Sequence, residues 1–327
     1  MNDLSVTAGR KLVLVHGRDF KPCEEDWLDV SVAALLAGIE RDFPEISEQF
    51  RVLNKQCGYY GDLTGEFLAS QGQRYDETLD VGDRRNALIS LKSIARKKNF
   101  GVNRYDRLPG KSALTEFAAG VIAPVLGRIG LSKKLLAKVG IDLAEYWNPN
   151  SDFGRRVRER VCGAICEALD ADDTIVLVSH GTGCLVTYDV LWELSHSEEY
   201  AAYHDRKVDL WLTLGAPLGD AMVQKRLFGA KKKGVERYPT NVVSWHNVSA
   251  EDDFVSHDNT LADDFKLMLS QHQVSCIRDY RIYNMAVRYG KSNPHSSLGY
   301  LIHPRTAQIV CEWLRKGVTE PLPKNIL

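Results

Sequence analysis

The sequence lacks the features that mark membrane-spanning, secreted or nucleic-acid-binding proteins. Its 327 residues contain no run of about 18 apolar residues, so we expect no transmembrane segment. The polar stretch at residues 1–10 has no apolar signal core, and we expect a cytoplasmic protein. Forty-two basic residues against 43 acidic ones leave a net charge of −1, so no overall field favours nucleic acid as a partner.

Cysteine and glycine signatures of metal and nucleotide sites are also missing. The seven cysteines show no CxxC or Cys/His spacing, and their odd number predicts reduced, partly buried thiols. Cys162 and Cys166 lie one helical turn apart, but no histidine or acidic pair joins them. There is no Rossmann glycine fingerprint, P-loop or internal repeat. We therefore expect no metal and no organic cofactor.

What is present is ample core material and one informative stretch, TIVLVSHGTGCLVTYDVL at residues 174–191. A composition of 44% hydrophobic and 26% charged residues is that of a globular chain, and we expect one domain over residues 1–327. Residues 174–178 predict a buried strand, and apolar residues at helical spacing follow from Leu185. A strand, a tight small-residue turn and a helix form the context of a nucleophile elbow.

The elbow pattern G-x-S-x-G falls on the turn of this stretch, but the residue at its serine position is not serine. With Gly183 as its last glycine, the pattern puts Ser179 at the first small position and Gly181 at the nucleophile. Shifting the frame to Ser179 or Thr182 loses the flanking small residues. The sequence therefore predicts a serine-hydrolase architecture in which glycine occupies the nucleophile position.

The other core elements predict a doubly wound, mainly parallel α/β sheet. A strand over 11–15, a helix over 24–41 and a strand over 51–60 form a β-α-β unit. Further strands are predicted over 208–214, 241–248 and 273–284, the last as a strand or an edge hairpin. Amphipathic helices are predicted over 152–169 and 304–315.

Residues 61–147 interrupt this alternation and predict a helical insertion. Helices are expected over 83–98, 112–129 and 131–143, and the third is apolar on one face and cationic on the other. Two interpretations stay open. The insertion is either a helical subdomain packed on the core, or a lid that shapes an acyl pocket or contacts a lipid surface.

A glycine turn, His16-Gly17-Arg18, ends the first strand, and Tyr188-Asp189-Val190-Leu191 lies in the elbow helix. With these motifs the chain resembles α/β-hydrolases of the esterase/lipase type, including bacterial members with a Ser-His-Ser-x-Gly elbow. The resemblance covers residues 11–60 and 150–316. It implies that the backbone N–H groups of Arg18 and Thr182 hold an oxyanion. It also implies that the substrate lies near His16, Gly17, His180 and Pro217.

The resemblance further implies an acid and a histidine after the elbow, in the order that this fold uses. The loop after strand 241–248 contains Asp253, which matches the family's Asp-x-Val pattern, with Asp252 as the alternative. His295 lies in a loop before the last helix and is the predicted general base. The histidines at 246, 257 and 303 are weaker candidates.

The implied reaction is the hydrolysis of a small-molecule or lipid-like ester by acyl transfer to water. Three interpretations of Gly181 stay open. The first is an active serine hydrolase whose nucleophile was replaced. The second is a natural pseudo-hydrolase that binds a ligand or a protein partner. The third is an enzyme with a displaced nucleophile at Thr182, Ser179 or Cys184. The sequence specifies neither acyl length nor oligomeric state.

Overall fold

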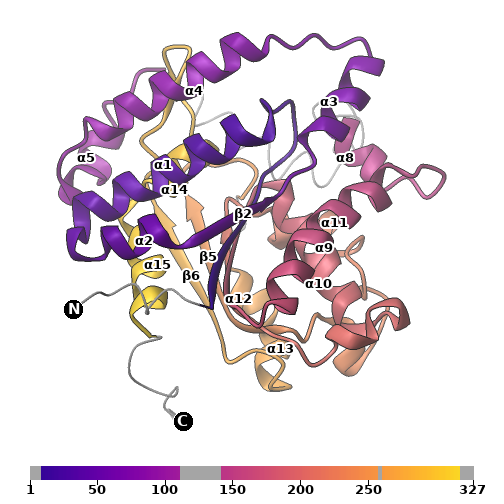
Figure 1. The fold of residues 1–327 in the computed structure, drawn as a ribbon. Coiled ribbons are helices and arrows are strands. Elements are labelled where there is room, and N and C mark those ends of the chain that lie inside the picture. The colour runs from indigo at the N-terminus through magenta and orange to yellow at the C-terminus, as the bar shows by residue number, and fades with distance from the viewer. Residues whose placement is uncertain (1–8, 111–140, 257–259, 317–327) are drawn as a thin grey trace.

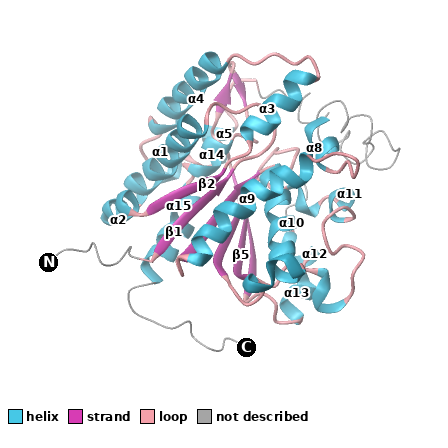
Figure 2. Ribbon diagram, turned by 45° about the vertical axis from the view of Figure 1, so that its right-hand side comes forward, coloured by secondary structure: helices cyan, strands magenta, loops and turns pink. Residues whose placement is uncertain are grey.

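The computed structural model describes residues 9–110, 141–256 and 260–316 (Figure 1). Its central element is a six-stranded sheet with the order β2-β1-β3-β4-β5-β6, in which every neighbouring pair is parallel. Helices cover both faces, which confirms the predicted doubly wound α/β class (Figure 2). The strands are β1 (Arg10–Val15), β2 (Asn54–Gly58), β3 (Thr174–His180), β4 (Val208–Leu214), β5 (Val242–Ala250) and β6 (Cys276–Ile282). A separate antiparallel pair joins β7 (Val287–Arg288) to β8 (Lys291–Ser292).

Most of the helices lie between these strands in the sequence, and the last two helices follow the last strand. They are α1 (Glu24–Asp42), α2 (Ser47–Val52), α3 (Gly61–Ser70), α4 (Glu77–Lys92), α5 (Val102–Tyr105), α8 (Ile141–Tyr146), α9 (Phe153–Asp170), α10 (Thr182–His196), α11 (Ala221–Gln224), α12 (Leu261–Asp264), α13 (Lys266–Ser270), α14 (Ser297–Leu301) and α15 (Pro304–Lys316). Short 3-10 helices are η2 (Pro44–Ile46), η3 (Lys97–Asn99), η4 (Glu198–Tyr203), η5 (Pro217–Gly219) and η6 (Gly234–Arg237).

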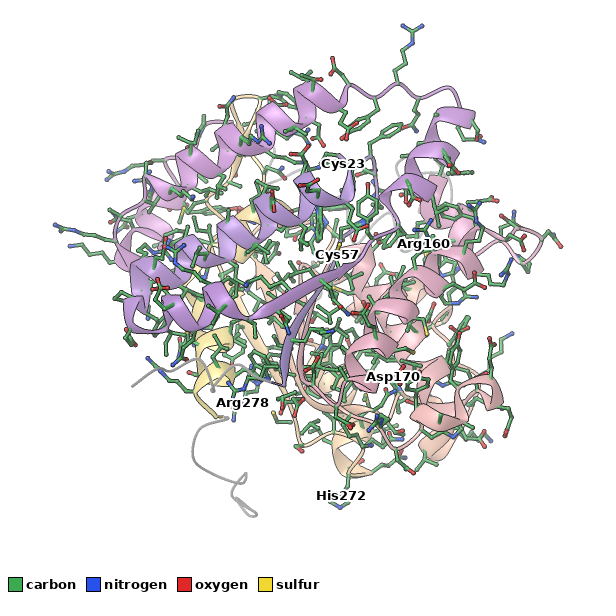
Figure 3. All side chains as sticks on the ribbon, in the orientation of Figure 1. Cys23, Cys57, Arg160, Asp170, His272 and Arg278 are labelled. Carbon is green, nitrogen blue, oxygen red and sulfur yellow. The ribbon has the colours of Figure 1, made fainter. Side chains whose placement is uncertain are left out.

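Alternation along the strands divides the buried residues between two cores. Leu12 and Leu14 of β1 face the core that α1 and α15 cover, whereas Val13 and Val15 face the core that α9 and α10 cover. Successive side chains of a strand point to opposite faces, so a strand buried on both sides is apolar throughout. Side chains fill both layers (Figure 3). All seven cysteines are free, and of the two labelled there Cys57 is buried and Cys23 exposed.

The sheet order creates a position at which ligands commonly bind. β1 lies between β2 and β3, and the helices α1 and α9 associated with these two connections pack on opposite faces. In open parallel sheets such a switch point leaves a crevice at the carboxyl ends of the strands. The ends of β1 and β3 carry His16-Gly17-Arg18 and His180-Gly181-Thr182 respectively.

Several predicted boundaries differ from the structure. The strand predicted over 51–60 is limited to β2, because residues 47–52 form α2 and bury Phe50. The helix predicted over 83–98 begins earlier, at Glu77, where the Asp76 side chain caps it by accepting from the Leu79 N–H at 2.9 Å. Of the residues predicted over 273–284 as a strand or an edge hairpin, Cys276–Ile282 form the edge strand β6. The helix predicted over 112–129 and most of the one over 131–143 lie outside the described residues.

Candidate active site

The turn between β3 and α10 has the geometry of a strained elbow. Gly181 has φ +56° and ψ −128°, and its N–H donates to the Leu214 carbonyl of β4 at 2.9 Å. A side chain in this region of backbone conformation costs on the order of 1–3 kcal/mol. Gly183 packs so closely on β1 that a Cβ there would lie 2.1 Å from the His16 carbonyl oxygen. The predicted strand, tight turn and helix are therefore all present around residue 181.

Asp253 and His295 meet beside this turn. The His295 Nδ1 lies 3.0 and 2.9 Å from the two Asp253 carboxylate oxygens. An N–H must donate to a carboxylate, so Nδ1 carries a proton, and in the neutral ring Nε2 is then the acceptor. A Cβ built on Gly181 lies 3.0 Å from that Nε2. Residues 181, 253 and 295, which are far apart in the sequence, thus lie next to one another in the structure.

Asp253 is the residue of the two candidate acids that faces the histidine. It is buried, and it also accepts from the Tyr300 hydroxyl at 2.6 Å and from the Val255 N–H at 2.9 Å. Asp252 has φ +59°, and its carboxylate accepts from the Tyr105 hydroxyl at 3.0 Å. Burial raises the pKa of Tyr300 well above its usual range, so its hydroxyl stays a proton donor to Asp253.

Two further residues support the Asp253–His295 pair, and neither was among the site residues predicted from the sequence. Gly215 has φ +59°, and a Cβ there would lie 2.9 Å from Asp253 Oδ2 and 3.2 Å from His295 Nδ1. Asn284 is buried and donates through Nδ2 to the carbonyls of Pro294 and Ser296, each at 2.9 Å. The only sequence signal for Asn284 was a polar residue at the end of the strand predicted over 273–284.

His180 and His16 are neutral residues of the pocket wall. His180 Nε2 donates to the His295 carbonyl at 3.0 Å, and the two rings lie 4.7 Å apart. His16 Nε2 accepts from the Tyr60 N–H at 3.1 Å, while its Nδ1 donates to the Gly17 carbonyl at 2.7 Å. Burial lowers the pKa of both imidazoles well below the usual value. Each therefore fixes a loop and does not exchange protons near neutral pH.

The two predicted oxyanion donors lie next to each other. The Arg18 N–H donates to the Thr182 hydroxyl at 2.8 Å, a contact that the sequence did not predict. Thr182 is the first residue of α10, so its N–H has no acceptor within the helix. Gly17 packs closely against the turn after β3. A Cβ at residue 17 would lie 3.1 Å from the His180 carbonyl oxygen and 3.7 Å from the Thr182 nitrogen.

The alternative nucleophiles have other partners. Ser179 is buried, and its hydroxyl accepts from Trp211 Nε1 at 2.9 Å. Cys184 is fully buried, and burial raises the pKa of its thiol to about 12. Thr182 has its hydroxyl engaged by Arg18. A thiol with so high a pKa is a poor nucleophile at neutral pH.

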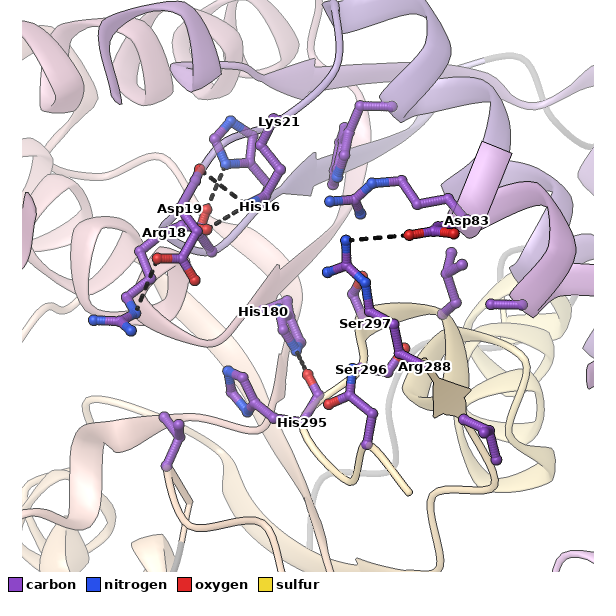
Figure 4. A pocket seen from close by; sticks show the side chains of 18 residues that line it. His16, Arg18, Asp19, Lys21, Asp83, His180, Arg288, His295, Ser296 and Ser297 are labelled. Carbon is purple, nitrogen blue, oxygen red and sulfur yellow. Dashed lines mark hydrogen bonds and ion pairs between the residues drawn. The ribbon is translucent and has the colours of Figure 1, made fainter. Parts of the chain in front are cut away.

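A pocket of about 250 Å³ opens in front of His295 (Figure 4). Of the predicted substrate-side residues it is lined by His16, Gly17, Arg18 and His180. Pro217 is buried at the start of η5 and is not among its lining residues. His246 and His303 do not line it either, and burial lowers the pKa of His303 to about 3. His257 lies outside the described residues.

Among the described residues, histidine, cysteine and acidic side chains form no group of three that could hold a metal ion. Within the same ranges, no helix is long and apolar enough to cross a membrane. Comparisons of the chain with protein-family models, with curated proteins and with solved structures find no match. Its function is therefore inferred from the geometry of this site.

Proposed function

We propose that this chain carries the active site of an ester hydrolase of the α/β-hydrolase type, with glycine at the nucleophile position. One observation carries the proposal. His295 directs Nε2 toward the Cβ position of residue 181 at 3.0 Å, while Asp253 holds Nδ1 from the other side. This is the order of contacts by which an acid orients a histidine and the histidine activates a hydroxyl.

With serine at position 181, the residues around it supply every step of acyl transfer. The hydroxyl oxygen attacks the ester carbonyl carbon as Nε2 of His295 takes the hydroxyl proton. The Thr182 N–H, which has no acceptor within α10, stabilises the resulting oxyanion by about 3 kcal/mol. The Arg18 N–H becomes a second donor when it exchanges the Thr182 hydroxyl for the oxyanion. His295 then gives the proton to the departing alcohol, and water hydrolyses the acyl-enzyme by the same route. Asp253 keeps the reactive tautomer and stabilises the imidazolium.

The glycine form lacks the covalent route but keeps the other parts. Its backbone donors and His295 do not depend on the side chain at 181, so we expect it to bind an ester. Triads without their nucleophile retain about 10³-fold catalysis over water, and we expect at most weak turnover of activated esters.

The second candidate function is a pseudo-hydrolase that binds a ligand or protein partner without chemistry. Gly181 itself favours this candidate, because glycine adopts φ +56° without the strain that serine has there. The retained Asp253–His295 pair favours the enzyme.

The deciding experiment compares Gly181→Ser with Gly181→Ala. Both variants carry the same Cβ in the same strained backbone, but only serine supplies a hydroxyl. We expect Gly181→Ser to hydrolyse 4-nitrophenyl acetate and to be labelled by a fluorophosphonate at residue 181, and Gly181→Ala to do neither. His295→Ala in the serine background should abolish most of the hydrolysis.

A correctly folded Gly181→Ser protein that neither labels nor hydrolyses any ester in a broad panel would make the pseudo-hydrolase the better account. Labelling of the glycine form at Thr182, Ser179 or Cys184 would instead identify a displaced nucleophile.

A further inference from the structure

The pocket that His295 lines is also rich in cationic side chains. Its lining residues include four Lys or Arg side chains and two acidic ones, Asp19 and Asp83. The cations are Arg18, Lys21, Arg84 and Arg288. Figure 4 shows Lys21 and Arg288 around the same space as His295 and His180. A pocket for a plain acyl chain would be lined mainly by apolar side chains.

A buried aspartate holds two of these cations in place. Asp80 of α4 accepts from Arg84 Nε at 2.8 Å and from Arg288 Nη2 at 2.9 Å. The Tyr75 hydroxyl donates to it as well, at 2.9 Å. Asp83 forms a longer ion pair with Arg288, with 4.0 Å between Oδ2 and Nη2 (Figure 4). One carboxylate therefore orients two guanidinium groups from different elements, α4 and β7, and each keeps further N–H donors.

Lys21 adds a third cation beside the predicted oxyanion donor. Its ammonium group donates to the backbone carbonyl of Arg18, to that of Asp19 at 3.2 Å and to that of Phe20 at 3.3 Å. None of the ion pairs between described residues includes Lys21. Burial, and then the nearby Arg84, lower the pKa of its ammonium to about 8. An anion in this pocket would offset the charge repulsion between Lys21 and Arg84.

We propose that the substrate is a short ester that carries an anionic group, a carboxylate or a phosphate, bound by Arg84 and Arg288. The inference rests on the proposed function, because it places the ester carbonyl at residue 181. Guanidinium forks match both anions in geometry, and pre-oriented arginines lose little freedom on binding them. A neutral long-chain ester would instead desolvate the N–H groups that Arg84 and Arg288 do not donate to Asp80, and would give those groups no acceptor. A cavity of about 250 Å³ also suits a short molecule.

The activity test uses matched esters with the Gly181→Ser enzyme. 4-Nitrophenyl hydrogen succinate is compared with its neutral methyl ester, and 2-acetoxyethyl phosphate with 2-acetoxyethyl methyl ether. We expect kcat/KM to be at least about tenfold higher for one or both anionic members, as charge-assisted hydrogen bonds allow. The member with the larger ratio identifies carboxylate or phosphate.

Arginine variants test the residues. Arg84→Gln and Arg288→Gln should each lower the anionic-to-neutral ratio of kcat/KM about tenfold, mainly through KM. Arg84→Lys keeps the charge and stem but loses the fork, so it should give an intermediate ratio. Arg85→Gln is the matched control, because Arg85 is the next residue of α4, is exposed and pairs with Asp26. It should leave the ratio unchanged.

Binding to the glycine form separates this inference from the proposed function. Calorimetry with succinate and with inorganic phosphate should show binding of at least one anion that Arg84→Gln and Arg288→Gln weaken and Arg85→Gln does not. If that pattern appears while Gly181→Ser is inactive, the esterase proposal fails and the anion site stands. If Gly181→Ser hydrolyses anionic and neutral esters equally, and no anion binds, the anion inference is overturned and the esterase stands.

Discussion

Gly181 and Gly215 both have positive φ, but they tolerate a side chain differently. At 181 the nearest atoms to an added Cβ are Nε2 and Cε1 of His295, at 3.0 and 3.3 Å. Both atoms belong to one imidazole ring, so an added Cβ at 181 requires only that ring to shift by a few tenths of an ångström. At 215 the added Cβ meets Asp253, Tyr300 and His295 together. These three groups hydrogen-bond one another and cannot retreat independently.

Gly215→Ala should therefore damage the site although it adds only a methyl group. We expect the free energy of unfolding to fall by about 1–3 kcal/mol, because alanine is strained at φ +59°. In the serine-181 background kcat should fall about 100-fold, because the Asp253–His295 pair is displaced. Urea unfolding and ester hydrolysis measure the two effects. Gly163→Ala on α9, where an added Cβ meets nothing within 4 Å, is the control. Unchanged activity in Gly215→Ala would show that the pair adapts.

The conformation of the loop that carries His295 is fixed by residues outside that loop. Asn284 binds the carbonyls on both sides of His295, and Gly299 packs so tightly that a Cβ there would lie 1.7 Å from Asn284 Oδ1. The loop geometry thus depends on one buried amide after β6 and one small residue in α14. Asn284 is a positioning residue and does not face the pocket.

Asn284→Ala in the serine-181 background should lower kcat more than it raises KM. Without the amide, the two carbonyls lose their donor and His295 samples orientations away from residue 181. We expect a fall of about tenfold or more in kcat, with steady-state kinetics as the measurement. Asn241→Ala is the matched control, because Asn241 is buried at the other end of the sheet, and its side chain has no hydrogen-bond partner among the described residues. Equal losses in both variants would indicate general destabilisation.

The helix α10 contains a carboxyl group whose charge opposes folding. Asp189 is fully buried, where it accepts from the Tyr146 hydroxyl at 2.8 Å and from the Phe228 N–H at 2.9 Å. Burial raises its pKa to about 7, whereas an unfolded aspartate has a pKa of about 3.9. Between these values the folded chain binds more protons than the unfolded chain. Stability from this group is therefore lost as pH rises from about 4 through about 7.

Asp189→Asn should remove that pH dependence. The difference in unfolding free energy, variant minus parent, should grow by up to about 4 kcal/mol between pH 4 and pH 7.5. Urea unfolding at a series of pH values measures it. A difference that stays constant across this range would show that Asp189 is already ionised in the folded protein at acidic pH.

The site was predictable where local pattern and chain order determine it. β3 and its glycine turn identified residue 181, and the order of the loops identified Asp253 and His295. The Asp-x-Val pattern favoured Asp253 over Asp252, but the sequence did not show what holds either carboxylate, because Tyr105 and Tyr300 are remote from them in the chain. The cations of the pocket come from the β1 loop, α4 and β7, and no local motif relates them. The boundary of β2 shifted because tertiary burial of Phe50 extended helical structure to residue 52.

Across the whole molecule, histidines buried in the neutral form oppose acid stability. Burial lowers the pKa of His16, His180 and His303, which lie after β1, at the end of β3 and between α14 and α15 respectively. For each, the unfolded chain binds a proton below about pH 6.5 that the folded chain does not. The stability that these groups contribute is therefore present above about pH 6.5 and is lost as pH falls.

His303→Gln should make the protein relatively more resistant to acid. Its pKa of about 3 means that the parent loses about 1.4 kcal/mol of stability per pH unit below 6.5 through this group, and the variant does not. The difference in unfolding free energy, variant minus parent, should thus grow as pH falls from 6.5 to 4.5. His16, His180 and Asp189 titrate in both proteins, so their effects cancel. Asp189→Asn is the internal control, because its difference grows in the opposite direction, as pH rises. Parallel pH curves for His303→Gln and the parent would mean that the imidazole is protonated without unfolding.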